Sequence, residues 1–279
     1  MHLLPGACLA KYAERVNVLN INDFLPRTNE KPLDAFVNDG GLIKIFRTLA
    51  VIGDSLSSGE FESYSEQYGK AYHDFYDYSW GQYIAREAGI TVYNFSRGGM
   101  TAKEYMESFS KYNGFWKEDK LCQGYIIALG VNDLLAQNME PGKADDADDR
   151  TCTTFAAYYG SIIRNIKQIQ PNARIFLMTM PREEDEAQNN IKKLHADILY
   201  DFAEKFDGVY VIDLFRYACV YDEEFKKTFY MGGHMNAAGY ILTAKMVMSY
   251  IDYIIRNNMD DFIQVPFIDK PYYNENYKR

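Results

Sequence analysis

Three polar segments and one late histidine carry the residue types of acyl-transfer chemistry. Ser55 stands in "VIGDSLSSG", directly after an apolar stretch, so its hydroxyl can be exposed where a strand ends. Gly99 lies in "NFSRGGMT" and Asn132 in "GVND", each after a further apolar stretch. His234 lies in "YMGGHMNAAGY", just before a helical pattern. A serine nucleophile, a histidine base and N–H donors for an oxyanion are the groups that ester hydrolysis needs.

Each of these residues is weak evidence when it is taken alone. The α/β-hydrolase elbow G-x-S-x-G would need glycine at position 57, where this chain has Ser57. A serine after a strand is more often a turn or N-cap residue, and a histidine at a helix entrance is more often structural. The functional interpretation therefore depends on which segments meet in space.

Apolar stretches alternate with helical patterns from residue 48 onward. The stretches are short and almost continuously apolar, as is typical of strands that are buried on both faces. They are "TLAVIGD" (48–54), "ITVYNFS" (90–96), "GYIIALG" (124–130), "ARIFLMTMP" (173–181) and "GVYVIDL" (208–214). The expected helices are Trp80–Ala88, Ala102–Ser110, Phe155–Ile169, Glu183–Phe206 and Ala237–Asn257, the last with Asn236 as its N-cap.

This alternation predicts an α/β fold, in which βαβ crossovers build a parallel sheet with helices on both faces. Ligands bind such sheets at the carboxyl ends of the strands. The segments with Ser55, Gly99 and Asn132 follow the first, second and third strands. We therefore expect them to meet at one edge, where two backbone N–H groups and the Asn132 amide can act as oxyanion donors.

The ordered motifs resemble the SGNH (GDSL) hydrolase family. "GDSL" at 53–56, a glycine after the second strand, "GVND" at 130–133 and a late histidine match its four blocks, from residue 48 to about 255. The resemblance implies a three-layer, flavodoxin-like fold with a five-stranded parallel sheet of order 2-1-3-4-5. It also implies hydrolysis of carboxylic esters without a cofactor or a metal.

The resemblance assigns roles to the residues named above. Ser55 and His234 would be catalytic, and Ser55, Gly99 and Asn132 would form the oxyanion hole. Gly98 is the alternative to Gly99, which the spacing within the motif favours.

One position departs from the family pattern, which has aspartate three residues before the catalytic histidine. That position holds Met231. A backbone carbonyl near the flexible Gly232–Gly233 pair is the first candidate to orient the imidazole. An upstream carboxylate is the second candidate, and a site without activity is the third. The upstream carboxylates are Asp222, Glu223 and Glu224.

Composition and charge limit the ligands. The formal charge of −9 and pI near 5.1 argue against a nucleic-acid surface and against an anionic membrane. Neutral or cationic ligands are favoured unless a local basic pocket is present. The four cysteines show no zinc or disulfide spacing, and no apolar run reaches the roughly 18 residues of a membrane span. We expect a cytoplasmic protein, and the oligomeric state stays open.

The domain organisation that we expect has three parts. Residues 1–47 decorate the domain, with one short strand at Val16–Ile21; residues 48–257 form the hydrolase domain; and residues 258–279 pack along its surface. The acidic run at 143–150 lacks the glycine and closing glutamate of a calcium loop, so we expect a solvated loop there.

Several polar residues have simpler interpretations. Asp54 is expected to hold its loop by accepting backbone N–H groups. Asp133 is expected to support the Asn132 loop, and Asp213 lies where it could line the site or be structural. His73 and His195 have no neighbouring motif and are expected at the surface or partly buried.

Aromatic residues are concentrated after the nucleophile segment. They are Tyr64, Tyr68, Tyr72, Phe75, Tyr76, Tyr78, Trp80 and Tyr83. Flat rings with polar tips suit sugars as well as acyl chains, although the same residues could simply pack the first helix. Together with the acidic charge, they favour a small-molecule ester, with a small acyl group on a neutral or carbohydrate alcohol.

Other functions remain open at this point. A lysophospholipase or thioesterase would use the same site with a long apolar groove, and an acyltransferase would differ only in its acceptor. A carbohydrate-binding pseudoenzyme is suggested by Met231. A flavodoxin-like redox protein is disfavoured, because the loop after the first strand lacks a Ser/Thr-rich phosphate cradle.

Overall fold

A computed structural model describes residues 21–268 of the chain. Its main sheet has five parallel strands, β1 (Thr48–Gly53), β4 (Thr91–Asn94), β5 (Gly124–Ala128), β6 (Arg174–Met178) and β7 (Val209–Ile212). They are arranged β4-β1-β5-β6-β7, which is 2-1-3-4-5 when these five are counted along the chain. The predicted α/β class with a parallel sheet is confirmed.

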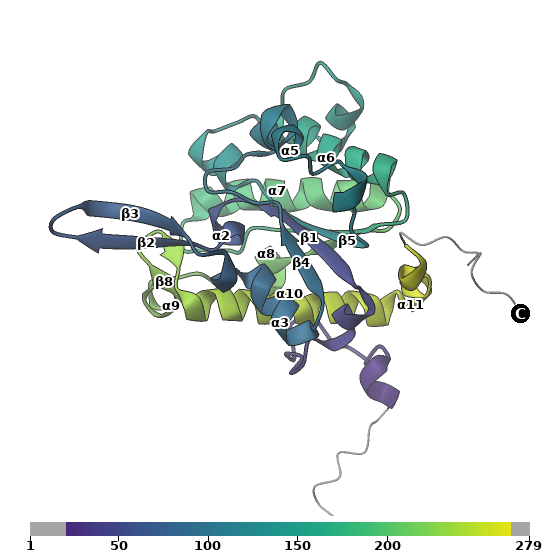
Figure 1. The fold of residues 1–279 in the computed structure, drawn as a ribbon. Coiled ribbons are helices and arrows are strands. Elements are labelled where there is room, and N and C mark those ends of the chain that lie inside the picture. Colours follow the sequence, from purple (N-terminus) through teal and green to yellow (C-terminus); the bar gives the residue numbers. More distant parts are fainter. Residues whose placement is uncertain (1–20, 269–279) are drawn as a thin grey trace, which may run out of the picture.

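Helices cover both faces of this sheet. In Figure 1, α3 (Trp80–Ala88) and α10 (Ala237–Asn257) lie on one face, and α6 (Phe155–Ile169) and α7 (Glu186–Lys205) lie on the other. Successive strand residues face opposite sides, so Ile126 packs in the core under α10 while Ile127 packs in the core under α6. Burial on both faces explains why these strands are apolar without alternation.

Local signals set most helix boundaries. α3, α6 and α10 begin and end as predicted, and the Asn236 side chain accepts a hydrogen bond from Gly239 N at 3.0 Å as the N-cap of α10. α7 begins at Glu186 rather than Glu183 because the Asp185 side chain caps its first turn.

The helix predicted at Ala102–Ser110 is wrong as one continuous element. The chain forms α4 (Ala102–Glu104), a π-helical turn (Tyr105–Phe109) and α5 (Ser110–Tyr112). The Ser110 hydroxyl donates to the Tyr105 carbonyl at 2.6 Å, which stabilises the wider turn. Such bulges depend on side-chain bonds that periodicity does not register.

Two hairpins lie outside the main sheet. β2 (Glu60–Ser65) and β3 (Gly69–Asp74) pair antiparallel directly after the nucleophile segment, and Figure 1 shows them projecting from the body of the molecule. β8 (Tyr230–Met231) and β9 (His234–Met235) form a short hairpin before α10. Neither hairpin was expected from the sequence.

The remaining elements are short. The α-helices are α2 (Ser55–Ser58), α8 (Leu214–Tyr217), α9 (Glu223–Phe229) and α11 (Met259–Phe262), and a second π-helical turn spans Val131–Ala136. The 3-10 helices are Ile21–Phe24, Gly41–Ile45, Tyr76–Tyr78, Glu118–Lys120, Ala144–Asp148 and Val265–Phe267. Within residues 21–268, no helix has the length and apolar character needed to cross a membrane.

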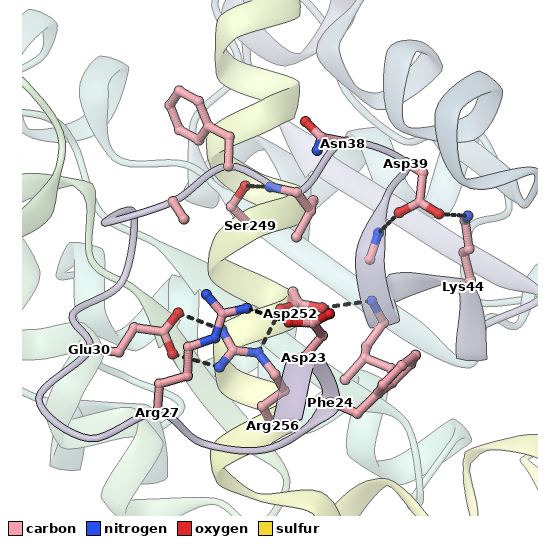
Figure 2. Close-up of a pocket in the computed structure, with 15 residues that line it drawn as sticks. Asp23, Phe24, Arg27, Glu30, Asn38, Asp39, Lys44, Ser249, Asp252 and Arg256 are labelled. Atoms are coloured by element: carbon pink, nitrogen blue, oxygen red, sulfur yellow. Dashed lines mark hydrogen bonds and ion pairs between the residues drawn. The ribbon is translucent and has the colours of Figure 1, made fainter. Parts of the chain in front are cut away.

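A buried ion network ties the segment before β1 to α10. Arg256 pairs with Glu30 at 2.6 Å and with Asp252 at 2.8 Å, and Asp252 also accepts the Leu42 N–H at 2.8 Å (Figure 2). A pocket of about 610 Å³ lies among these groups. The predicted strand at Val16–Ile21 falls outside the described residues except for Ile21, which begins a 3-10 helix.

Candidate active site

Ser55 is the first residue of α2, immediately beyond the carboxyl end of β1. The Asp54 side chain caps this helix by accepting the Leu56 N–H at 3.0 Å, which confirms the loop-holding role predicted for it. Ser55 is half-buried. The short helix therefore presents the serine at the sheet edge where ligands bind in this class of fold.

Gly99 and Asn132 lie in the loops after the neighbouring strands β4 and β5. Gly99 has φ of 70°, and a side chain there would meet no atom within 4 Å, so its backbone faces open space. The Asn132 amide donates one N–H to the Met100 carbonyl at 3.0 Å, which links the two loops. A primary amide has a second N–H, and that one can serve a ligand.

Asp133 supports this pair of loops, as predicted. Its buried carboxylate accepts the Ala102 N–H at 2.9 Å and so joins the start of α4 to the loop after β5. Desolvation raises the pKa of Asp133 to about 6 and that of Asp54 to about 7. Two buried carboxyls therefore titrate near neutrality beneath the candidate site.

His234 lies in β9 and is held between two glutamates of β2. Its Nε2 is 3.0 Å from Glu60 Oε1, and its Nδ1 is 3.8 Å from Glu62 Oε2. α2, β2 and β9 pack against one another, so Ser55, Glu60 and His234 sit on neighbouring elements. With a carboxylate accepting from Nε2, the Nδ1 nitrogen keeps the imidazole lone pair.

Glu62 is anchored by other partners. Its carboxylate accepts the Gly233 N–H at 2.9 Å and pairs with Lys70 at 2.7 Å, and these bonds lower its pKa. A side chain at Gly232 would overlap this carboxylate. The glycines before His234 therefore give Glu62 close access to the backbone of the β8–β9 turn.

Glu60 lies between the His234 segment and the loop after β4. A side chain at Gly98 would overlap its Oε2, so the carboxylate reaches from His234 to the loop after β4. Burial raises the pKa of Glu60, while the nearby His234 opposes that rise. Glu60 thus bridges the histidine segment and the glycine loop.

The expected partners of His234 were wrong. No described hydrogen bond joins its Nδ1 to a backbone carbonyl, because that buried atom has no partner within residues 21–268. Asp222 instead caps α9 by accepting the Phe225 N–H at 2.8 Å. The alternation in "EFES" could have indicated a strand with Glu60 and Glu62 on one face, but only the docking of that strand brings them to His234.

His195 was also misplaced by sequence reasoning. It is fully buried on α7, and its Nε2 lies 3.0 Å from the Leu129 carbonyl, directly under the turn at Gly130. A side chain at Gly130 would lie 2.7 Å from that nitrogen. Desolvation lowers the pKa of His195 to about 4, so a neutral ring supports the loop that carries Asn132.

Asp213 does not line the site. It is buried at the end of β7, where it caps α8 and accepts a hydrogen bond from Tyr200 at 2.9 Å. Its role is structural.

A pocket of about 460 Å³ opens beside these residues. Leu56, Val131 and Gly233, the chain neighbours of Ser55, Asn132 and His234, contribute to its wall. Met180, Pro181, Tyr221 and Tyr230 also line it, as do Glu183, Lys192 and Lys226. The volume is in the range of small-molecule sites. No group of three His, Cys, Asp or Glu side chains within the described chain is arranged to hold a metal ion.

Comparisons with known proteins identify the family and show which solved proteins share the fold. A model of the GDSL-like lipase/acylhydrolase family matches residues 51–242. No curated protein sequence matches the chain significantly.

Solved carbohydrate esterases share the fold. A family two carbohydrate esterase from Clostridium thermocellum, in complex with cellohexaose, has a TM-score of 0.55 and 16% identity, over 83% of this chain and 66% of its own. A family 3 carbohydrate esterase of the same organism has a TM-score of 0.51 and 17% identity, over 75% of this chain and 97% of its own. A family 2 enzyme from Corynascus thermopiles has a TM-score of 0.52 and 14% identity, over 74% of this chain and 65% of its own. The chain thus spans just under two thirds of the family 2 structures.

Proposed function

The chain belongs to the GDSL-like lipase/acylhydrolase family of ester hydrolases, and we propose that it is a serine esterase acting on small acyl groups carried by a carbohydrate alcohol. One observation carries the proposal of an active site. His234 is paired with a partly buried carboxylate, Glu60, beside the helix that begins with Ser55. This contact supports Glu60 as the acid for the proposed base, in place of the usual aspartate that Met231 replaces.

The first step is attack by Ser55. Its hydroxyl oxygen bonds to the ester carbonyl carbon while the imidazole of His234 accepts the hydroxyl proton. Collapse of the tetrahedral intermediate returns that proton to the leaving alcohol and gives an acyl-serine. Water then attacks the acyl-serine with the same histidine as base, which releases the acid and restores Ser55.

The oxyanion of each tetrahedral intermediate needs donors. The backbone N–H groups of Ser55 and Gly99 and the free N–H of the Asn132 amide are the candidates. Loss of one such donor typically raises the barrier by about 3 kcal/mol.

The carboxylate of Glu60 acts through the imidazole. It accepts the Nε2–H, so Nδ1 keeps the lone pair, and its charge stabilises the imidazolium that forms. Nδ1 is buried 3.8 Å from Glu62 Oε2, so the proposed step requires this nitrogen to turn toward Ser55 when substrate is bound. This proposal replaces the aspartate of the family pattern by a glutamate that precedes the histidine in sequence.

The carbohydrate alcohol is proposed on three grounds. The neighbouring folds include esterases described as carbohydrate esterases, one of them bound to cellohexaose. The net charge of −9 disfavours anionic substrates. A tyrosine ring lies next to the proposed base, since Tyr72 contacts His234 edge-on at 5.5 Å between ring centroids.

The test compares the wild-type protein with Ser55→Ala on p-nitrophenyl acetate, followed by acetylated sugars and long-chain esters. We expect activity in the wild type, at least a 1,000-fold drop in the variant as is typical of lost triad members, and a preference for acetylated sugars. Faster turnover of long-chain esters would instead identify a lysophospholipase or thioesterase. Equal, negligible rates together with no labelling of Ser55 by a serine-directed phosphonate would identify a pseudoenzyme.

A further inference from the structure

The β2–β3 hairpin presents one continuous face to the candidate site. Cross-strand partners share a face, and the pairs Glu62↔Tyr72 and Tyr64↔Lys70 follow one another along the ladder. Glu62 and Tyr72 lie over His234. The next pair outward therefore continues the same face away from the catalytic residues.

Aromatic rings on this face are open to solvent. Tyr72 is 54% exposed and Tyr64 is 77% exposed, and Tyr68 in the turn is 78% exposed. Tyr64 lies two residues beyond the Tyr72 row, which is about 7 Å along a strand. This spacing is comparable to the length of one sugar ring.

The other face of the hairpin is used for packing. Phe61 contacts Phe75, Tyr78 and Tyr240 at its base, and His73 stacks on Phe75. Phe61 thus docks one face at the base of the hairpin and Glu62 docks the other face on the β8–β9 turn, while Tyr64 and Tyr72 stay exposed beside these contacts.

The hairpin is also tied directly to the nucleophile helix. Ser58 of α2 donates to Asp74 at 2.7 Å, and the Phe75 N–H donates to the Gly59 carbonyl at 2.9 Å. At the base of β2, the Tyr240 hydroxyl donates to the Glu60 carbonyl at 2.6 Å. The exposed tyrosines thus hold a defined position relative to Ser55.

Charge on this face is balanced. Lys70 pairs with Glu62 at 2.7 Å, which leaves the strip between Tyr72 and Tyr64 without a net charge. In the turn, Glu66 and Gln67 are exposed beside Tyr68, so the tip adds one carboxylate. Flat aromatic rings beside a neutralised ion pair and an exposed carboxylate suit a neutral sugar better than a lipid or an acidic peptide.

From these observations we propose that the Tyr72–Tyr64 face, with Tyr68 at its tip, binds the glycan chain of the substrate beyond the sugar that carries the acyl group. The inference rests on the proposed esterase function and extends it from acylated sugars in general to an oligosaccharide or polysaccharide. The occupant is a neutral chain of several sugars, held by stacking on the exposed rings.

The experiment measures the turnover of two substrates and the binding constant of one of them. Wild type, Tyr64→Ala and Tyr112→Ala are assayed on p-nitrophenyl acetate and on partially acetylated cellohexaose. Tyr112, 92% exposed at the end of α5, is the matched control for loss of a surface tyrosine. Binding of the acetylated cellohexaose to the Ser55→Ala chain, with and without Tyr64→Ala, is measured by calorimetry.

We expect Tyr64→Ala to raise KM for the hexasaccharide, and Kd in the Ser55→Ala background, about tenfold, with p-nitrophenyl acetate turnover unchanged. Tyr112→Ala should change neither. An unchanged Kd, or no binding at all, would overturn the proposed glycan face. So would a Tyr64-dependent dimer in sedimentation, which would assign this face to a second copy of the chain.

The two proposals can fail separately. An inactive wild-type protein would contradict the esterase function, while the calorimetric arm would still decide whether the hairpin binds the glycan.

Discussion

At the scale of single residues, the candidate site is defined by how His234 is held. Glu60 contacts Nε2 at 3.0 Å, and Glu62 lies 3.8 Å from Nδ1 while it is bound to Lys70 and Gly233. The first contact is within hydrogen-bond distance and the second is not. Glu60 is therefore the carboxylate that we expect to matter for the base.

The substitution Glu60→Gln should lower kcat for p-nitrophenyl acetate about 100-fold or more, since loss of tautomer control in a catalytic triad is severe. Steady-state kinetics of the variant and the wild type at one pH measure this drop.

Two matched variants give this prediction its controls. Glu66→Gln removes an exposed carboxylate from the tip of the same hairpin and should leave kcat unchanged. If Glu62→Gln lowers kcat and Glu60→Gln does not, then Glu62 orients His234 through Nδ1, and Nε2 faces the serine.

A second prediction concerns how the ionisation of Asp54 makes the stability of the protein depend on pH. Its folded pKa of about 7 is above the ordinary value of about 3.9 because its carboxylate is desolvated. The folded chain therefore binds this proton more tightly than the unfolded chain. This tighter proton binding stabilises the folded chain. The stabilisation is fully present below about pH 4 and is lost as the pH rises to about 7. The loss has an upper limit on the order of 4 kcal/mol, at about 1.4 kcal/mol per pKa unit.

Asp54→Asn keeps the oxygen that caps Leu56 N and removes the titration. The unfolding free energy of the variant, relative to wild type, should rise by a few kcal/mol between pH 4.5 and pH 7.5. Urea denaturation across that range tests this. Exposed Asp77→Asn is the control, and an equal pH dependence in wild type and Asp54→Asn would contradict the assignment.

At the scale of elements, the short helix α2 and the β2–β3 hairpin form one unit around Gly59. This residue ends α2 with φ of 83°, and a Cβ there would lie 2.7 Å from the Phe75 carbonyl oxygen. Because of this turn, β2 begins directly after the nucleophile helix. This places Glu60 and Glu62 of β2 next to His234.

Gly59→Ala should therefore both destabilise the protein and lower activity per folded molecule. Gly69 is the matched control, with φ of 70° and no atom within 4 Å of an added Cβ. Gly69→Ala should cost about 1 kcal/mol from the left-handed backbone alone, and Gly59→Ala at least roughly twice that. Urea denaturation and p-nitrophenyl acetate assays test this, and equal effects of the two variants would contradict it.

At the scale of the whole molecule, the segment before β1 and the candidate active site depend on different interactions. The network of Arg256, Glu30 and Asp252 is largely buried and holds that segment on α10 (Figure 2). None of the three lies in the pocket beside Ser55. Stability and catalysis can therefore be changed separately.

Arg256→Met should lower the unfolding free energy by about 3–5 kcal/mol, because it leaves two largely buried carboxylates without their cation. Activity per folded molecule should stay near wild type. Arg27→Met breaks an exposed pair with Asp23 and should change stability by less than about 1 kcal/mol. Thermal and urea unfolding separate the two variants, and a matching loss of kcat in folded Arg256→Met would show that the segment influences the site.

The sequence alone determined the architecture. Apolar stretches located the five parallel strands, and helical periodicity with Asn236 as N-cap located α10 to the residue. It also predicted that the segments with Ser55, Gly99 and Asn132 follow neighbouring strands. These features depend on local burial and capping, which a short window of sequence records directly.

Only the tertiary structure decided what surrounds His234. Glu62 and Gly233 are 171 residues apart, and their hydrogen bond exists because the β2–β3 hairpin docks on the β8–β9 turn. Tyr64 and Tyr72 on the hairpin stay exposed, while Trp80 is buried where α3 packs against α10, although all three belong to one aromatic-rich segment. His195 was buried by packing of α7 under the loop after β5. Such contacts depend on how whole elements fit together, and no local pattern of residues specifies that fit.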